Sequence, residues 1–283
     1  MIDHKAYPYV YTSSQLGKYF GISIKGIEYY ERKKLINPKR VGNNNQRQFN
    51  LNDTYRIFMA RYLSQSGLTL NDTLDVLNAS NEQIALKFLV KNLHDSEKEL
   101  KRINTSIEVM THNIKLLQKV LNYHSFFEIT KSPTLKTLFL REMDGPHKSN
   151  QEQTDEYRTW NELMPITNGS IRYRKKDILN KTSKIEPEIE MIISEKYFKA
   201  FGLKNSNRVN TIPSKTCLHT VVVGNAQNID NKGWLNSIRS YLKENNYLLN
   251  GDIITSLLLV LDNSQKHIRY DEAWIPIKSK WWK

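Results

Sequence analysis

Cys217 and His219 stand two residues apart, and a thiol beside an imidazole is the pair that cysteine nucleophiles use. In a strand, however, residues two apart point to the same face, so these side chains run parallel instead of meeting. No helix N-terminus is expected there that would lower the pKa of the thiol. Cys217 is also the single cysteine of the chain, which excludes an internal disulfide and a multi-cysteine metal site. We therefore expect no catalytic residue.

The remaining chemistry-bearing residues lack the spacing of an enzyme site. The seven histidines show no metal-ligand pattern, and the sequence contains no P-loop and no dinucleotide-binding fingerprint. We expect a protein that is not an enzyme and that holds no metal and no cofactor. A hydrolase in the C-terminal half is the alternative, and it would need a titratable pair of residues in a cleft.

The charge balance favours a polyanionic partner. Lysine and arginine number 42 against 29 acidic residues, so the net charge is +13. Such a protein often binds nucleic acid, although a general preference for lysine would leave the same composition. With 39% hydrophobic residues the chain is globular. It begins with no signal-peptide pattern, and its most apolar run, residues 253–261, is too short for a membrane span, so we expect a cytoplasmic protein.

Residues 1–80 have the pattern of a winged helix-turn-helix. Thr12 or Ser13 caps a helix that stops at Gly21, and Ser23 caps a second helix. Two short helices around a tight turn predict a helix-turn-helix. The second helix would lie in a major groove, and Lys25 stands at its N-terminal end, which faces base edges and phosphates.

A polar hairpin is expected after these helices. Residues 39–41 and 46–49 can pair as short strands, so that Arg40 and Arg47 reach phosphates or the minor groove. A third helix follows, capped by Asn52 or Asp53, and its expected inward residues are Ile57, Phe58, Tyr62 and Leu63.

In order and spacing, residues 9–78 resemble the winged-helix domain of the MerR family of bacterial transcription regulators. The most diagnostic pieces are Gly21-Ile22-Ser23, Tyr29-Tyr30-Glu31, Leu35-Ile36-Asn37-Pro38, Arg47 and Gly67-Leu68-Thr69-Leu70. The resemblance implies double-stranded promoter DNA as the partner. The expected DNA-binding residues are Ser14, Lys25, Tyr29, Arg40 and Arg47.

Two positions depart from the family pattern. Glu28 stands where the family usually has arginine, and Gln46 stands where it has an aromatic residue. A glutamate that faced phosphates would repel them. We therefore expect Glu28 to pair with a neighbouring lysine or arginine, or to bias the protein toward a particular operator.

From Leu93 the apolar residues follow a heptad, which predicts a coiled coil over about thirty residues. The alternative is a helix packed on its own chain, but the unbroken period favours a second helix of equal length. In MerR-like proteins this helix pairs two subunits, so the resemblance implies a homodimer. The expected dimerisation residues are Leu93, Leu100, Ile103, Ile107, Met110, Ile114, Leu117 and Leu121.

Residues 126–283 carry one pattern twice. The first β-α-β-β unit has strands near 134–141, 170–177 and 188–193 and a helix near 151–163; the second has strands at 216–223, 253–262 and 270–277 and a helix at 232–245. Two such units indicate an internal duplication with a cleft between the halves. The fold class is therefore α+β. The expected domains are a winged helix at 1–80, a coiled-coil helix at 81–125 and a duplicated domain at 126–283.

The run Thr211-Ile212-Pro213 and the closing residues 270–277 resemble the GyrI-like effector-binding domain of multidrug-responsive activators. That resemblance implies an aromatic cleft with a glutamate that neutralises lipophilic cations. Our alignment places Thr255 at the position of this acid, so we expect a neutral or anionic effector, or an acid from elsewhere such as Glu190. The expected ligand-binding residues are Tyr157, Trp160, Tyr173, Trp234, Thr255 and Tyr270. Core packing could also explain each of the five aromatic residues.

These patterns predict a ligand-responsive, homodimeric, sequence-specific transcription regulator. The resemblance implies that the dimer bends and untwists promoter DNA so that RNA polymerase engages both promoter elements. The alternative is a protein that sequesters a small molecule and whose DNA-binding half is degenerate.

Overall fold

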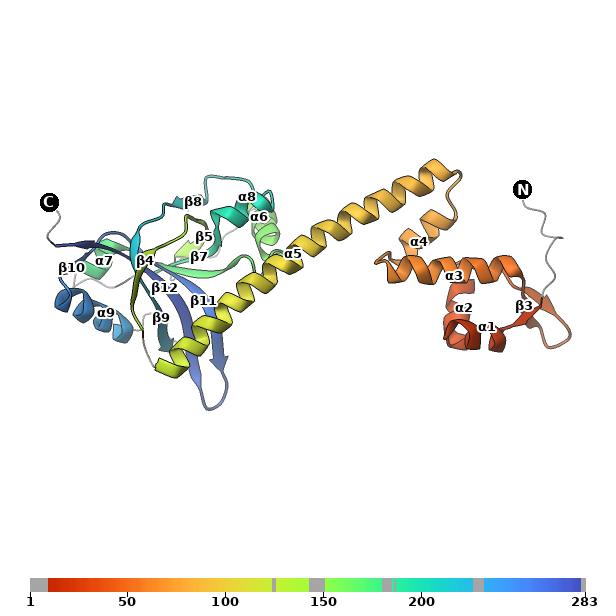
Figure 1. Ribbon diagram of the computed structural model, residues 1–283, viewed down its shortest axis with the longest axis horizontal. Coiled ribbons are helices and arrows are strands. Elements are labelled where there is room, and N and C mark those ends of the chain that lie inside the picture. The colour runs from red at the N-terminus through yellow and green to blue at the C-terminus, as the bar shows by residue number, and fades with distance from the viewer. Residues whose placement is uncertain are drawn as a thin grey trace. The chain divides into compact units, whose positions relative to one another are not determined.

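The computed structural model describes residues 10–123, 126–142, 151–179, 185, 187–225 and 232–280 (Figure 1). The chain divides into two compact units, Met1–Lys101 and Arg102–Lys283. Helix α5 (Glu82–Tyr123) is 42 residues long, so it begins in the first unit and ends in the second. The helix expected for residues 81–125 is therefore present, and the division between the units runs through it.

The first unit is a small helical domain with a three-stranded sheet in the order β1-β3-β2. Its helices before α5 are α1 (Ser13–Phe20), α2 (Ile24–Arg32), α3 (Leu51–Gln65) and α4 (Leu70–Leu77), and its strands are β1 (Tyr11–Thr12), β2 (Lys39–Val41) and β3 (Gln46–Phe49). The antiparallel pair β2 and β3 is the expected wing.

Local capping signals determine where these helices begin. The Thr12 hydroxyl accepts a hydrogen bond from Gln15 N, and the Ser23 hydroxyl accepts one from Gly26 N, so both expected caps are confirmed. Gly21 ends α1 in the left-handed conformation, with φ of 60°, which a residue without Cβ adopts without strain. Helix α3 starts earlier than expected, because Asn50 is its cap.

The core of the first unit is built around Leu16, Ile27, Leu35, Phe49 and Ile57, none of which is exposed. The prediction that Phe58 and Tyr62 point inward is wrong, because each is 59% exposed. Helix α3 turns Ile57, Ala60 and Leu63 inward at intervals of three residues, and that spacing directs Phe58 and Tyr62 away from the core.

The second unit is built on an antiparallel sheet in the order β4-β9-β12-β11-β6-β7-β5-β8, with β10 paired to β12. Its strands are β4 (Glu128–Lys131), β5 (Leu135–Glu142), β6 (Asn168–Tyr173), β7 (Glu188–Ser194), β8 (Val209–Ile212), β9 (Thr216–Asn225), β10 (Tyr247–Leu249), β11 (Ile253–Asp262) and β12 (His267–Ser279). Its helices after α5 are α6 (Gln151–Asn161), α7 (Lys175–Leu179), α8 (Glu195–Ala200) and α9 (Lys232–Glu244).

The two expected β-α-β-β units occupy the two halves of this sheet. Strands β5, β7 and β6 form one half, strands β9, β12 and β11 form the other, and the halves meet where β6 pairs with β11. Strand β4 precedes the first β-α-β-β unit in the chain but pairs with β9 of the second. Strand β8 precedes the second β-α-β-β unit but pairs with β5 of the first. Each half therefore receives an edge strand from the other part of the chain. The internal duplication itself stays a prediction.

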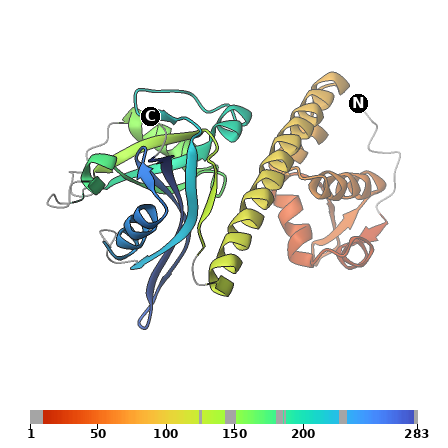
Figure 2. The same ribbon diagram turned by 60° about the vertical axis from the view of Figure 1, so that its left-hand side comes forward.

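Helices cover the two faces of the sheet differently. Helix α9 packs Leu235 and Ile238 against Leu218 and Ile275 on one face. The C-terminal part of α5 lies along the other face, where Leu116 and Val120 contact Val221 and neighbouring side chains. Figures 1 and 2 both place α9 and this part of α5 on opposite sides of the sheet. None of the helices within the described residues is long and apolar enough to cross a membrane.

Candidate functional site

Four of the expected DNA-binding residues are exposed on the first unit. Ser14 lies in the first turn of α1, Lys25 and Tyr29 lie on α2, and Arg40 lies on the wing strand β2. The Tyr29 ring has two cations near it, since Arg32 Cζ lies 5.7 Å and Lys33 Nζ 5.9 Å from the ring centre. Helix α2 therefore presents a cationic and aromatic surface of the kind that phosphates bind.

Arg47 of the wing is held against α2 by two glutamates. Its Nη1 lies 3.1 Å from Glu28 Oε1, and its Nε donates to Glu31 Oε2 at 2.8 Å. Arg40 also pairs with Glu31. Burial alone would raise the pKa of Glu31, but the hydrogen bonds from Arg47 and Arg40 outweigh burial and lower it. The expectation that Glu28 pairs with a neighbouring cation is thus met by Arg47.

The expected dimerisation residues line an open stripe on α5. Leu93, Leu100, Ile107 and Leu121 are each more than half exposed, and Met110 and Ile114 are similarly open. Leu117 is partly covered. The side chains that α5 buries on its own sheet are different ones, Leu116 and Val120. A single chain thus leaves the heptad stripe uncovered except at Leu117.

A cavity of about 440 Å³ lies in the second unit between α5 and the sheet. Its walls are mostly apolar, with a few polar side chains that converge on the interior. Glu108 and Glu272 are acidic, and among the described residues at the wall there is no lysine or arginine. The wall also includes His112, Ser256 and Trp274.

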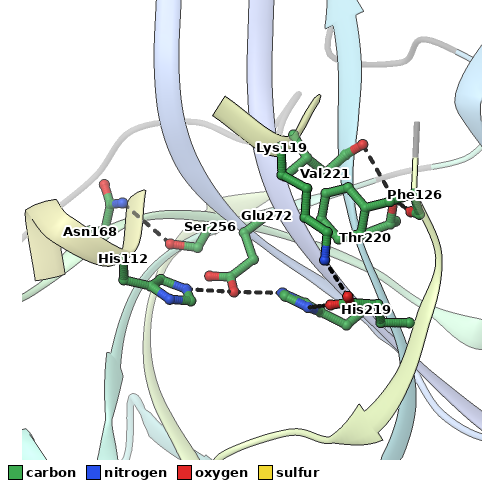
Figure 3. Close-up of polar contacts among 10 residues, drawn as sticks. His112, Lys119, Phe126, Asn168, His219, Thr220, Val221, Ser256 and Glu272 are labelled. Atoms are coloured by element: carbon green, nitrogen blue, oxygen red, sulfur yellow. Dashed lines mark hydrogen bonds and ion pairs between the residues drawn. The ribbon is translucent and has the colours of Figure 1, made fainter. Parts of the chain in front are cut away.

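Glu272 on β12 is the best-buried acid of this cavity, with 8% of the residue exposed. Its Oε1 accepts hydrogen bonds from two imidazoles, at 3.0 Å from His112 Nε2 on α5 and 2.7 Å from His219 Nε2 on β9 (Figure 3). Burial would raise the pKa of this carboxyl, but the bonds from both histidines outweigh burial and lower it. The carboxylate is therefore ionised near neutral pH.

The polar contacts continue behind His219. Its ring stacks on Trp274 with 4.2 Å between the ring centres, and its Nδ1 lies 4.0 Å from Glu128 Oε2 on β4. Glu128 in turn pairs with Lys119 of α5. The hydrogen bond to Glu272 raises the pKa of His112, and partial burial opposes that effect.

None of the six expected ligand-binding residues lines this cavity. Trp160 is 1% exposed and packs on Phe198, while Tyr173 contacts Trp234 edge-on within the core that α9 covers. Tyr157 is on α6, and Thr255 bonds the backbone of Ile171. Tyr270 alone faces α5, beside Val221.

The sequence predicted a cleft without the family's carboxylate on its strand, but this cavity contains a buried one, Glu272. Ser256 lines the cavity, and because side chains alternate along a strand, Thr255 points to the opposite face of β11. Glu272, on the neighbouring strand, supplies the acid instead. The alternation of Tyr270, Glu272 and Trp274 in the sequence was the signal that could have found it. Glu190 is not at the wall: it is buried with Arg172 at 3.0 Å, and burial raises its pKa to about 7.

Cys217 and His219 share a face of β9 but do not act as a pair. Cys217 is buried at a smaller cavity of about 200 Å³, and burial raises the pKa of its thiol, so the reactive thiolate is disfavoured. His219 is engaged by Glu272. Within the described residues, no three His, Cys, Asp or Glu side chains are grouped so that they could hold a metal ion.

Comparison with protein families gives one match. The model described as MerR HTH family regulatory protein matches residues 11–79, the segment that forms the winged helix. A comparison with curated proteins finds no match.

Among solved structures, the chain is similar to EcmrR in a complex with DNA, at 12% identity and a TM-score of 0.34 over 95% of this chain and 100% of that one. The C-terminal domain of EcmrR gives 13% identity and a TM-score of 0.39, covering 55% of this chain and 98% of that one. A hydrolase from Listeria innocua gives 10% identity and a TM-score of 0.33, covering 54% of this chain and 91% of that one.

Proposed function

We propose that this chain, which carries a MerR-family helix-turn-helix regulatory domain in residues 11–79, is a ligand-responsive transcription regulator that binds promoter DNA as a homodimer. The observation that carries the proposal is the winged helix itself: α2 exposes Lys25 and Tyr29, and the wing carries Arg40 and Arg47 beside it. With one helix in the major groove and one basic hairpin on the flanking phosphates, each subunit would recognise one half-site of the DNA.

The homodimer is supported by the uncovered heptad stripe of α5. Pairing with a second helix would remove these apolar side chains from water, which is favourable. Two copies joined along α5 would bring two winged helices to one duplex. Such an arrangement reads a pseudo-palindrome and is the geometry in which a regulator bends and untwists promoter DNA for RNA polymerase.

The effector site of this proposal is the cavity under α5. Its volume of about 440 Å³ lies within the range of small-molecule sites, and its walls combine an apolar lining with few polar groups. The acids Glu108 and Glu272 disfavour an anion, so we infer an effector with an apolar body that is neutral or positively charged. The effector acts only through a higher affinity for one geometry of the dimer.

A mobility-shift titration with the full chain and DNA from upstream of its own gene tests DNA binding. We expect specific binding at about 0.15 M salt, and a variant Lys25→Gln that binds more weakly by roughly 1 kcal/mol, with a shallower salt dependence. Lys176→Gln on α7 removes the same charge from the other unit and serves as the control. Equal binding to specific and unrelated fragments would contradict the proposal.

A second function is favoured by one observation. Arg40 and Arg47 are already paired with Glu28 and Glu31, which reduces the charge that the wing offers to phosphates. A protein that sequesters a small molecule in the cavity and no longer binds specific DNA would show this feature. It would bind ligand normally and fail the mobility-shift test.

A further inference from the structure

Five side chains form a continuous series of polar contacts that leaves α5 and returns to it. Lys119 on α5 pairs with Glu128, and Glu128 approaches His219. His219 bonds Glu272, and Glu272 bonds His112 on α5 (Figure 3). His112 and Lys119 are seven residues apart, so they lie on one face of the helix, two turns apart. This face of α5 is thus attached to the sheet at two polar points.

Glu272 and His112 belong both to this series and to the wall of the cavity. Their exposure differs: the Glu272 side chain is 10% exposed and the His112 side chain is 52% exposed. The Glu272 carboxylate is buried between the sheet and α5, while about half of the His112 side chain faces solvent. A ligand that approaches the carboxylate from the cavity therefore meets His112 as the group that can leave.

We propose that His112 is a built-in competitor of the effector: in the empty cavity it occupies the Glu272 carboxylate, and an organic cation displaces it and frees this part of α5 from the sheet. The inference rests on the proposed effector cavity. It adds which atom the ligand takes, which side chain it replaces and what that replacement does to α5.

The charge of the ligand follows from the burial of Glu272. A buried carboxylate that loses a hydrogen-bonding cation without replacement is strongly destabilised. A neutral ligand that moved His112 aside would leave Glu272 with His219 alone. A cation keeps the carboxylate compensated, and Trp274, which also lines the wall, is an apolar contact for its body.

The charged groups around His112 determine how strongly its imidazole competes with a cationic ligand for Glu272. Glu272 on β12 favours the protonated imidazole, and Lys115 on α5 opposes it. Glu108, one turn earlier, is engaged by α8, since the Tyr197 hydroxyl donates to it at 2.7 Å and Lys196 lies at 4.0 Å. His219 and Glu128 stand on β9 and β4 behind Glu272. Acid therefore strengthens the competitor, and a cation of fixed charge should bind more tightly as pH rises.

The release of α5 would be local. Leu116 and Val120 remain buried against Val221, and Lys119 keeps its contact with Glu128. Only the turns around His112 lose their polar attachment to the sheet. The displaced segment carries Ile107, Met110 and Ile114 of the heptad stripe, so the ligand acts on the helix that the proposed dimer shares.

The test uses the full chain and rhodamine 6G, a fluorescent cation of fixed charge, titrated by anisotropy from pH 5.5 to 8.5. We expect the affinity of the unsubstituted protein to rise at least about fivefold across this range. His112→Gln should flatten the profile to within about twofold and bind about fivefold more tightly at pH 5.5. His267→Gln, a histidine on β12 that pairs with Asp262, should keep the original profile. Glu190 also titrates in this range, and comparison of the variants isolates the part due to His112.

Hydrogen exchange of the α5 amides gives the second readout. The dye should accelerate exchange around residues 108–115 in the unsubstituted protein, and His112→Gln should show faster exchange there without the dye. The inference is overturned by equal pH profiles in the two proteins, by unchanged exchange on binding, or by absence of dye binding at every pH. These outcomes leave DNA binding untouched. Conversely, the expected profile in a protein that binds no promoter fragment would keep the inference and remove the proposed regulator.

Discussion

Arg47 Nη1 on the wing lies 3.1 Å from Glu28 Oε1 on α2, so a glutamate of one candidate DNA-binding element holds an arginine of the other. The same guanidinium donates through Nε to Glu31, and this hydrogen bond raises the pKa of Arg47 further above its usual range. The wing is thereby fixed against the helix, and the two glutamates neutralise part of its positive charge.

The first prediction concerns Glu28→Gln. Removing this carboxylate leaves Arg47 bonded to Glu31 and frees its charge for a phosphate, so the affinity for specific DNA should rise about threefold to tenfold at 0.1 M salt. Mobility-shift titrations at several salt concentrations measure both the affinity and its salt dependence. Asp75→Asn on α4 removes an equal charge from an exposed site and should change the affinity by less than about twofold. A weaker complex with Glu28→Gln would mean that Glu28 positions Arg47 instead of masking it.

The second prediction concerns the heptad stripe. Ile107→Glu places a charge at the centre of the proposed paired helices, and a buried unpaired charge costs several kcal/mol. Sedimentation velocity should show a dimer for the unsubstituted chain and a monomer for this variant. Asn104→Glu adds the same charge at an exposed position of α5 outside the stripe and should remain dimeric. A monomer before any substitution would contradict the homodimer directly.

The third prediction follows from Glu190. Burial raises its pKa to about 7, well above that of an ordinary glutamate, so the unfolded chain releases this proton first as pH rises. The free energy of unfolding should therefore fall between about pH 4.5 and pH 7, by roughly 1 to 3 kcal/mol, and stay level above. Glu190→Gln should remove most of this fall in urea titrations at pH 5 and pH 8. Glu162→Gln, an exposed glutamate, should not; an identical fall in all three proteins would exclude Glu190 as its source.

The fourth prediction concerns the other polar attachment of α5. Lys119 contacts Glu128 and lies over the Phe126 ring, with 4.3 Å from Nζ to the ring centre, but it does not line the cavity. Lys119→Gln should accelerate hydrogen exchange near residues 116–123 while leaving the affinity for a cationic dye at pH 8 within about twofold. Lys87→Gln, an exposed lysine of α5 in the first unit, should change neither quantity. A large loss of dye affinity in Lys119→Gln would show that the whole polar series shapes the cavity.

The sequence alone determined the winged helix. The caps at Thr12 and Ser23 and the left-handed stop at Gly21 act within three or four residues, so each is readable without knowledge of the fold. The resemblance over residues 9–78 agrees with the family match at 11–79. The same short-range logic located the long helix and the main strands of both halves of the sheet. It failed on α3, because the choice between the faces of Phe58 and Ile57 depends on the neighbours that α3 meets.

Only the tertiary structure decided where the cavity under α5 lies and which residues line it. Glu272 and His112 are 160 residues apart in the chain, and only the placement of α5 on the sheet brings them within 3.0 Å. Strand alternation in the sequence grouped Tyr270, Glu272 and Trp274 on one face, but it could not show that this face was the one under α5 and that Thr255 pointed to the other. Periodicity shows which side chains share a face, but the partner that covers that face depends on contacts between segments that are distant in the sequence.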